Sequence, residues 1–409
     1  MSGRPYRNIC SIMAAIAAAT ALMTCPGTAL RGQELPDRGI ALHDRQTLAR
    51  MLDATPPEAP VRDTAVMVFI GDVMLHKAQI MNAHERYGGE MDSSMHEAYD
   101  FSQYLSGISH RLREADIAVA NMEFTLAGPP FTGYPSFSAP DSYAEYMAEC
   151  GIDVFLTANN HICDKGDRGL ERTLARYREL GKTHGIRTAG TYDTRCDTCQ
   201  GILFVRARGI KVAIINFTYG TNAAMGKRYR ACTGSPDTIR NLFRKAAEAD
   251  PELIIAMPHW GEEYRLLHSP EQERTAELLA ENGADIIIGT HPHVVQDCDT
   301  ISVSTGEGHR NVPVIYSLGN IVSNMSARDT QLGLMLTLRI CRDEEGQAEI
   351  LPPEYGFTWC SLPGRLTDSH ATVPVKEYLH RKDEWLSAWD WIKMKDTYKR
   401  VRETTGIQD

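Results

Sequence analysis

Residues of the types that bind metal ions follow six short apolar runs of this sequence. Each cluster begins where its apolar run ends and holds carboxylate, carboxamide or imidazole side chains. In chain order these residues are Asp72; Asn121 and Glu123; Asn160, His161 and Asp164; His259 and Glu262; His291, His293 and Gln296; and Asn320. Hard divalent ions prefer oxygen ligands, and first-row transition ions also accept imidazole. The pattern therefore predicts a site for divalent metal ions.

The apolar runs have the length and the β-branched content of buried strands. We expect strands at residues 66–70, 117–120, 154–157, 212–216, 253–257, 285–288, 314–317 and 333–340. Amphipathic stretches predict helices at residues 101–115 and 167–180, the second ending at Gly181, and a helix that begins after Ser269 and stops at Asn282 and Gly283. This order indicates an α/β fold with parallel strands, whose carboxyl ends form the ligand crevice.

Each cluster taken alone also has a purely structural interpretation. Asp72 after a glycine is often only part of a turn, and His161 could simply lie at the start of a helix. His291 and His293 would place two imidazoles on one side of an extended backbone, which suits one metal ion or two adjacent ones. Six such coincidences at one sheet edge favour the metal site.

Composition bounds the class of protein. The 409 residues include 43 Lys and Arg against 53 Asp and Glu, for a formal net charge of -10. These values are typical of a globular protein and exclude a collagen, a coiled coil or a wholly disordered chain. The acidic balance argues against a nucleic-acid partner and against anionic membranes as a partner of the folded surface. No Walker-type phosphate loop occurs, which argues against an ATP-driven ligase working by itself.

The first 30 residues predict an export signal. Arg4 and Arg7 precede an apolar run at residues 9–23, which small residues and Pro26 follow. Cys25 suggests a lipoprotein cleavage box, with simple secretion and an uncleaved anchor as the alternatives. All three place the mature protein outside the cytosol, in the periplasm or cell envelope. Residues 31–65 are polar and rich in proline, so we interpret them as a linker.

The other cysteines give weaker signals. In an oxidising compartment some of them would pair. Cys196 and Cys199 form a single C-x-x-C, for which a loop disulfide or two free thiols is favoured over a zinc site. Cys163 lies beside the strongest motif, and we interpret it as a packing residue.

The order of the motifs resembles the bacterial CapA-type proteins, a family associated with capsule and poly-γ-glutamate synthesis. The resemblance covers about residues 66–340 and rests on the sequences G-D-V-M, N-M-E, A-N-N-H-x-x-D-x-G, H-W-G-x-E, G-x-H-P-H-x-x-Q and Y-S-L-G-N. The family is similar in turn to calcineurin-like metallophosphoesterases. The resemblance implies a four-layered α/β/β/α sandwich at residues 66–345, and residues 346–409 are expected to form a C-terminal extension with a strand or loop and an amphipathic helix.

The resemblance also implies roles for the clustered residues. Asp72 and His293 would bind one metal ion, Glu123 would bridge two ions, and the second ion would be held by Asn160, His259 and His291. His161 would be the acid that protonates a leaving group. Supporting or substrate-facing roles would fall to Asn121, Asp164, Glu262, Gln296, Asn320 and Lys165.

One position departs from the metallophosphoesterase pattern. Those enzymes have a histidine where this chain has Met74, and His76 lies two residues further on. One site would therefore be poorer in ligands, so the expected cofactor is one or two divalent ions of Mn, Fe, Zn or Mg.

These implications lead to three functional hypotheses. The first is an exported capsule or surface-polymer (poly-γ-glutamate-type) protein with a metal-dependent hydrolase or phosphoesterase site. The second is a non-catalytic assembly or polymer-anchoring component, and the third is an amide or γ-glutamyl hydrolase or transferase. A full ligand set favours an enzyme. Expected partners are a surface polymer or small anionic substrate and other capsule-synthesis proteins, with the membrane reached only through the N-terminal signal or a lipid. The loop at residues 128–140 is expected to form either a lid, a sugar-facing wall or an ordinary surface loop.

Overall fold

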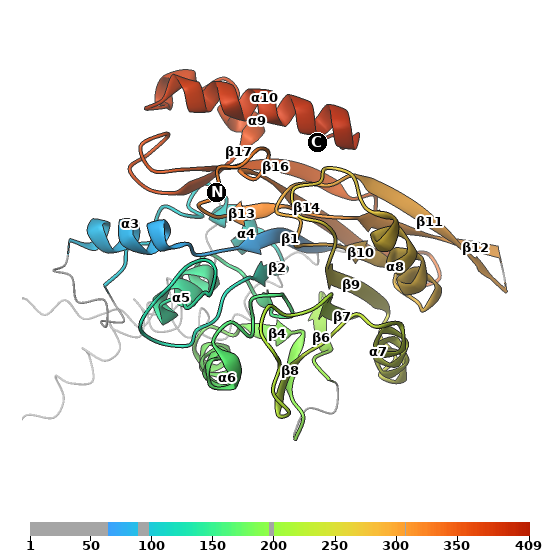
Figure 1. Cartoon of the computed structure of the whole chain (residues 1–409). Coiled ribbons are helices and arrows are strands. Elements are labelled where there is room, and N and C mark those ends of the chain that lie inside the picture. The colour runs from blue at the N-terminus through green and yellow to red at the C-terminus, as the bar shows by residue number, and fades with distance from the viewer. Residues whose placement is uncertain (1–63, 89–97, 196–199, 307) are drawn as a thin grey trace, which may run out of the picture. The chain divides into compact units, whose positions relative to one another are not determined.

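The computed structural model of the chain describes residues 64–88, 98–195, 200–306 and 308–409 (Figure 1). The predicted export signal, nearly all of the linker and the Cys196–Cys199 pair lie outside these residues. Within the described part, none of the helices combines the length and the apolar character needed to cross a membrane. Among the described residues, Cys150, Cys163, Cys298, Cys341 and Cys360 are free thiols.

A nine-stranded sheet carries the first half of the site. Its strands are β1 (Ala65–Val73), β2 (Ile117–Met122), β3 (Val154–Leu156), β4 (Arg187–Ala189), β13 (Asn320–Val322), β14 (Leu332–Arg342), β15 (Ala348–Ile350), β16 (Glu354–Ser361) and β17 (Ala371–Pro374). The order is β17-β16-β14-β1-β2-β3-β4, with β13 beside β1 and β15 beside β14. Strands β1 to β4 are parallel, so their carboxyl ends lie at one edge.

A six-stranded sheet carries the second half. Its strands are β6 (Leu203–Ala207), β7 (Ile210–Thr218), β9 (Leu253–His259), β10 (Ile286–Ile288), β11 (Cys298–Thr305) and β12 (Gly308–Ile315), in the order β11-β12-β10-β9-β7-β6. Strands β7, β9, β10 and β12 are parallel. A separate pair joins β5 (Thr191–Asp193) to β8 (Tyr229–Ala231).

The two sheets pack face to face, and helices cover their outer faces. Met67 and Phe69 of β1 lie in a core shared with Val212 and Ile255 of the other sheet, while Val68 faces the helices. The nine-stranded sheet is covered by α3 (Lys77–Tyr87), α4 (Ser109–Glu114), α5 (Asp141–Glu149) and α6 (Gly166–Thr183). The six-stranded sheet is covered by α7 (Pro236–Glu248) and α8 (Pro270–Glu281). The predicted α/β/β/α sandwich is confirmed (Figure 1).

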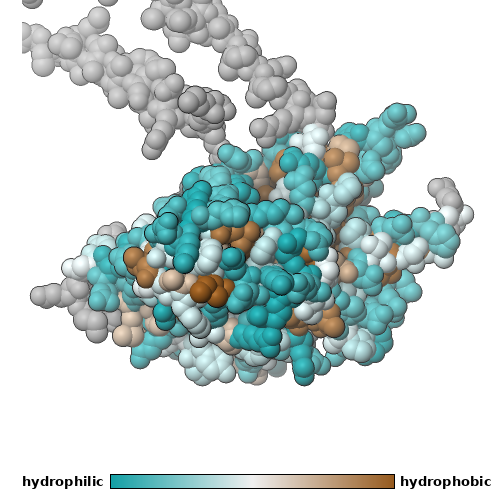
Figure 2. Space-filling model, turned by 90° about the horizontal axis from the view of Figure 1, so that it is seen from above, coloured by the Kyte–Doolittle hydropathy of each residue, from teal (hydrophilic) through white to brown (hydrophobic). Residues whose placement is uncertain are grey.

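The C-terminal residues extend this sandwich. Strands β16 and β17 lengthen the nine-stranded sheet, and α9 (Val375–Tyr378) and the 3-10 turn η1 (Lys382–Glu384) lead to α10 (Ala388–Thr405). Helix α10 packs Met394, Tyr398 and Val401 onto the core between the sheets. Its face of the molecule is mostly hydrophilic, with small apolar patches between polar side chains (Figure 2).

Two predicted helices differ from the structure. Only residues 109–114 of the predicted helix at 101–115 are helical, because Asp100 accepts the Ser102 N–H and begins a series of turns instead. Helix α6 continues past Gly181 to Thr183, and the left-handed residue that follows it is Gly185, with φ 76°. The third prediction is confirmed: Ser269 caps α8 through the Gln272 N–H, and Gly283 follows with φ 109°.

The prediction that all six clusters lie at the edge of a single sheet is wrong, because the strands that carry them are divided between two sheets. The chain leaves the six-stranded sheet after Ile315 and enters the nine-stranded sheet at Asn320, which lies opposite Asp72. The Asp72 N–H donates to the Gly319 carbonyl at 2.9 Å. A Cβ atom at Gly71 would lie 1.8 Å from that oxygen, so the close approach of the two segments requires glycine here.

Candidate metal centre

The candidate ligands meet between the carboxyl ends of the two sheets. Asp72 lies in β1, Glu123 directly follows β2, and Asn160 follows β3. From the other sheet, His259 is the last residue of β9, and the turn after β10 carries His291 and His293. All six side chains are buried.

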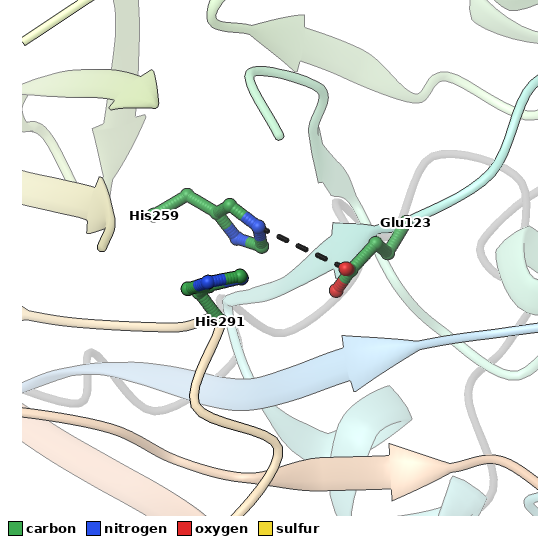
Figure 3. Close-up of side chains that lie close together, drawn as sticks. All are labelled: Glu123, His259 and His291. Carbon is green, nitrogen blue, oxygen red and sulfur yellow. Dashed lines mark ion pairs between the residues drawn. The ribbon is translucent and has the colours of Figure 1, made fainter. Parts of the chain in front are cut away.

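In the part of the chain that the structure describes, three groups of side chains have ligand atoms within 4.8 Å of one another. The first consists of Glu123, His259 and His291, and the second of Asp72, Glu123 and His293. The third consists of Glu263, His291 and His293. Glu123 belongs to the first two. Figure 3 shows Glu123, His259 and His291 pointing toward one another from separate segments of the chain. This is the arrangement in which one carboxylate could bridge two ions.

Hydrogen bonds orient the group around Asp72. Asn121 donates its amide to Asp72 Oδ1 at 2.8 Å, and the His293 Nδ1 atom lies 3.3 Å from Asp72 Oδ2. The same nitrogen is 3.0 Å from Asn320 Oδ1, so two oxygens fix the His293 ring. Asn121 and Asn320 therefore each hydrogen-bond to a candidate ligand, which is the position expected of supporting residues.

The second group is oriented in the same way. His259 Nε2 lies 2.9 Å from Asn160 Oδ1, and its Nδ1 atom lies 3.0 Å from the Thr290 hydroxyl. The contact with Thr290 fixes the ring and leaves Nε2 directed at Asn160 and at Glu123 Oε1, 3.8 Å away.

The side chains of Glu123, His259 and His291 fit a divalent cation, as their unsatisfied polar atoms and their shifted pKa values show. Glu123 Oε1 and His291 Nδ1 are buried and have no hydrogen-bond partner. Burial and the Asp72 carboxylate raise the pKa of Glu123 well above its usual value. Burial and the neighbouring His293 lower the pKa of His291 to about 4, and burial also lowers the pKa of His259. Neutral imidazoles and a carboxylate that lacks a counter-charge suit metal binding.

The backbone of the His-x-His turn is not extended, so that expectation is wrong. His291 has φ 103° and His293 has φ 60°, in the left-handed region that favours glycine. Non-glycine residues are held there at a cost, and such strain is concentrated at functional sites. The turn also lets the His291 N–H reach Asp72 Oδ2 at 3.3 Å.

His161 belongs to none of the ligand groups found among the described residues. Its Nδ1 atom is 2.8 Å from Asp164 Oδ2, and its ring meets that of Phe137 edge-on at 4.6 Å. Phe137 is buried and donates its N–H to the same carboxylate oxygen at 2.8 Å. Phe137 thus packs the loop at residues 128–140 against His161, while Tyr134 of the same loop is exposed.

Comparison with known proteins identifies the family. The model of the family "Bacterial capsule synthesis protein PGA_cap" matches residues 66–325. The chain belongs to this family. The resemblance to CapA-type proteins is therefore confirmed.

Two curated relatives of the PGA_cap chain come from Bacillus species. The capsule biosynthesis protein CapA of Bacillus anthracis is 28% identical over 292 residues, which are 67% of this chain and 64% of that protein. The PGA biosynthesis protein CapA of Bacillus subtilis is 23% identical over 299 residues, which are 69% and 70% of the two chains. The match thus spans slightly less than two thirds of the first relative.

Solved structures similar to the chain include two hydrolases. The calcineurin-like phosphoesterase YfkN of Bacillus subtilis is 12% identical, with a TM-score of 0.40 over 83% of this chain and 99% of that one. The sulfate thiohydrolase SoxB of Thermus thermophilus is 12% identical, with a TM-score of 0.38 over 83% of this chain and 60% of that one.

One residue expected at this site lies elsewhere. The Glu262 side chain is 67% exposed and lies 3.6 Å from Arg265. The next residue, Glu263, instead forms a group with His291 and His293 whose ligand atoms lie within 4.8 Å of one another. Tyr264 follows with φ 66°, so a tight turn determines which of the two glutamates faces the histidines. The only sequence signal for Glu263 is its position four residues after His259.

The remaining predicted residues play different parts. Gln296 donates to the Arg265 and Leu267 carbonyls and accepts from Gln272, so it holds the loop around Glu263 in place. Lys165 precedes α6, and among the described residues it makes no hydrogen bond or ion pair with the ligands. Cys163 packs in a small apolar cluster, and burial raises its pKa to about 11.

Met74, which stands where the metallophosphoesterases have a histidine, is part of the hydrophobic core. Met74 is buried, and its carbonyl accepts the Tyr143 hydroxyl at 2.9 Å. His76 belongs to none of the ligand groups found among the described residues, and its Nδ1 atom lies 3.3 Å from the Asn324 nitrogen. The group of Asp72, Glu123 and His293 therefore gains no ligand from either residue.

Proposed function

We propose that this PGA_cap protein is a metal-dependent hydrolase of the phosphoesterase type that acts in the synthesis of a capsule or similar surface polymer. One observation carries the proposal: six buried ligands from two sheets converge so that two groups of ligand atoms share Glu123. A structural core has no use for two buried carboxylates and three imidazoles gathered in one place.

The candidate residues would have separate roles in metal binding and proton transfer. Asp72, Glu123 and His293 would hold one divalent ion, and Glu123, Asn160, His259 and His291 would hold the other. Such ions supply a hydroxide nucleophile at neutral pH and stabilise negative charge on a phosphoryl oxygen. His161, held by Asp164, would deliver a proton to the leaving oxygen.

The cellular setting belongs to the same proposal. The two relatives are named for capsule and PGA biosynthesis, and the N-terminal 30 residues have the pattern of an export signal. The protein would therefore act in the envelope on a surface polymer or a precursor of it. It would work beside other proteins of capsule synthesis and reach the membrane through its N-terminal signal or a lipid on Cys25.

Metal content and hydrolysis test the proposal together. We would measure bound metal by elemental analysis and assay phosphoester substrates with added Mn²⁺, for the wild type, Asp72→Ala and His291→Ala. Glu262→Gln is the matched control, because that carboxylate faces solvent. We expect close to two ions per wild-type chain, and loss of metal and activity in the two site variants only. A folded wild type without metal or activity would instead support a non-catalytic assembly role.

A further inference from the structure

Two tyrosines lie between the buried ligands and solvent. Tyr219 is 55% exposed and Tyr264 is 49% exposed, although each ring contacts the ring of a buried candidate ligand. The centroid of the Tyr219 ring lies 4.7 Å from that of the His291 ring. The centroids of the Tyr264 and His293 rings are 6.3 Å apart. We call Tyr219 and Tyr264 the rim tyrosines. Large apolar surface exposed beside a polar site is a common mark of ligand binding.

Backbone hydrogen bonds fix the rim tyrosines to the segments that carry the ligands. The Tyr219 N–H donates to the His259 carbonyl at 3.0 Å, and the Tyr264 N–H donates to the Pro292 carbonyl at 2.8 Å. Tyr264 is held at φ 66°, which a bulky residue adopts only under constraint. Both rings are therefore placed at a set position relative to the candidate metal centre.

The charge around the ligands is negative. Among residues 64–88, 98–195, 200–306 and 308–409, no lysine or arginine forms a hydrogen bond or ion pair with any of the six candidate ligands. Glu263 instead adds a third carboxylate to those of Asp72 and Glu123. A phosphate that carries two negative charges is usually bound with help from arginine. The two proposed ions would be largely offset by these carboxylates, and no arginine contact is added for a second phosphate charge, so a phosphate with a single charge is favoured.

We propose that the substrate is a phosphodiester with a ring-bearing group, and that this group stacks on the rim tyrosines while the phosphate lies at the ligands. This inference rests on the proposed hydrolase function. In the reaction, a bond forms between the water oxygen and phosphorus, and one P–O ester bond breaks. The leaving oxygen takes a proton, and the products are a phosphomonoester and an alcohol.

Two substrates with the same leaving group test the charge argument. Bis(4-nitrophenyl) phosphate carries one negative charge, and 4-nitrophenyl phosphate carries two at pH 8. We expect the wild-type kcat/KM to be at least tenfold higher for the diester. An equal or higher value for the monoester would overturn the inference and leave the proposed function standing. A metal-loaded protein that hydrolyses neither would overturn both.

A second pair of substrates tests the stacking argument. Methyl 4-nitrophenyl phosphate has the charge and leaving group of the bis ester but lacks its second ring. We expect Tyr219→Ala and Tyr264→Ala to lower kcat/KM for the bis ester about threefold to tenfold more than for the methyl ester. Tyr219→Phe and Tyr264→Phe keep the ring but lose the hydroxyl contacts with Asn160 and Glu263, so any loss of kcat/KM should be the same for both esters. Equal losses on both substrates would rule out stacking.

Discussion

His161 depends on Asp164 for the orientation of its imidazole. The Asp164 carboxylate lies 2.8 Å from His161 Nδ1 and is itself held by the Phe137 N–H, so Nδ1 carries the proton shared with Asp164 and Nε2 is left for the substrate. We expect Asp164→Asn to lower kcat about 10-fold to 100-fold, because an amide no longer holds the ring in this state. The measurement is kcat of the wild type and of Asp164→Asn for phosphoesters whose leaving groups differ in basicity.

The dependence on leaving group separates this role from metal binding. A basic leaving group needs a proton more than 4-nitrophenolate does, so the loss in Asp164→Asn and His161→Gln should grow with leaving-group basicity. Metal content should stay at the wild-type level in both variants. A uniform loss across leaving groups, or a loss of metal, would contradict the assignment of His161 as the acid.

Glu262 and Glu263 form a natural pair of test and control. They are adjacent, but only Glu263 has a carboxylate oxygen close to His291 and His293, whereas Glu262 pairs with Arg265 at the surface. We expect Glu263→Gln to weaken Mn²⁺ affinity about 10-fold, within the range known for groups that support ligands. Glu262→Gln should leave the affinity unchanged. A calorimetric titration of both variants measures this, and equal affinities would show that Glu263 takes no part.

At the scale of elements, the sequence locates the candidate ligands, but it does not predict how the fold arranges them. Asp72, Glu123 and His259 lie at the ends of long apolar strands, and this local signal is visible without the fold. The division of the strands between two sheets depends on pairing across the whole chain, which the local pattern does not determine. Glu263 lies in an exposed turn with no apolar periodicity, so only the folded backbone reveals it.

The junction of β1 and β13 depends on a glycine. At Gly71 a Cβ atom would lie 1.8 Å from the Gly319 carbonyl oxygen, so Gly71→Ala must push the two segments apart. We expect a loss of about 1–3 kcal/mol in the free energy of unfolding, together with weaker metal binding through the displaced Asp72. Gly356→Ala in β16 is the control, because its Cβ would meet only ordinary contacts at 3.7 Å or more. Urea unfolding compares the two, and equal stabilities would contradict this explanation.

His370, directly before β17, links stability to pH. Burial lowers its pKa from 6.5 to about 3, with a smaller contribution from His76, and its Nε2 atom lies 2.9 Å from Asn324 Oδ1. The unfolded chain binds a proton below pH 6.5 and the folded chain does not, so stability falls as the pH falls. His370 should account for about 2 kcal/mol of loss between pH 7 and pH 5. His370→Gln should remove that part of the slope in urea titrations at the two pH values, and an unchanged slope would show that His370 does not cause it.

At the scale of the whole molecule, the candidate centre joins the two sheets. Asp72, Glu123 and Asn160 come from the nine-stranded sheet, and His259, His291 and His293 come from the six-stranded sheet. A bound ion would thus connect two layers that are otherwise held by the apolar core between them. Since the ligands come together only in the folded chain, metal binding should stabilise the fold as a whole.

Metal removal should therefore lower the melting temperature. At 100 times the dissociation constant, one bound ion stabilises the folded state by about 2.7 kcal/mol, which corresponds to about 3–4 °C for a chain of this size. We expect EDTA to lower the Tm of the wild type by this amount and added Mn²⁺ to restore it. In Asp72→Ala and His291→Ala, both treatments should change the Tm less than in the wild type, because each variant lacks a ligand of one of the two ions. Equal effects of EDTA on the wild type and both variants would place the stabilising ion elsewhere in the protein.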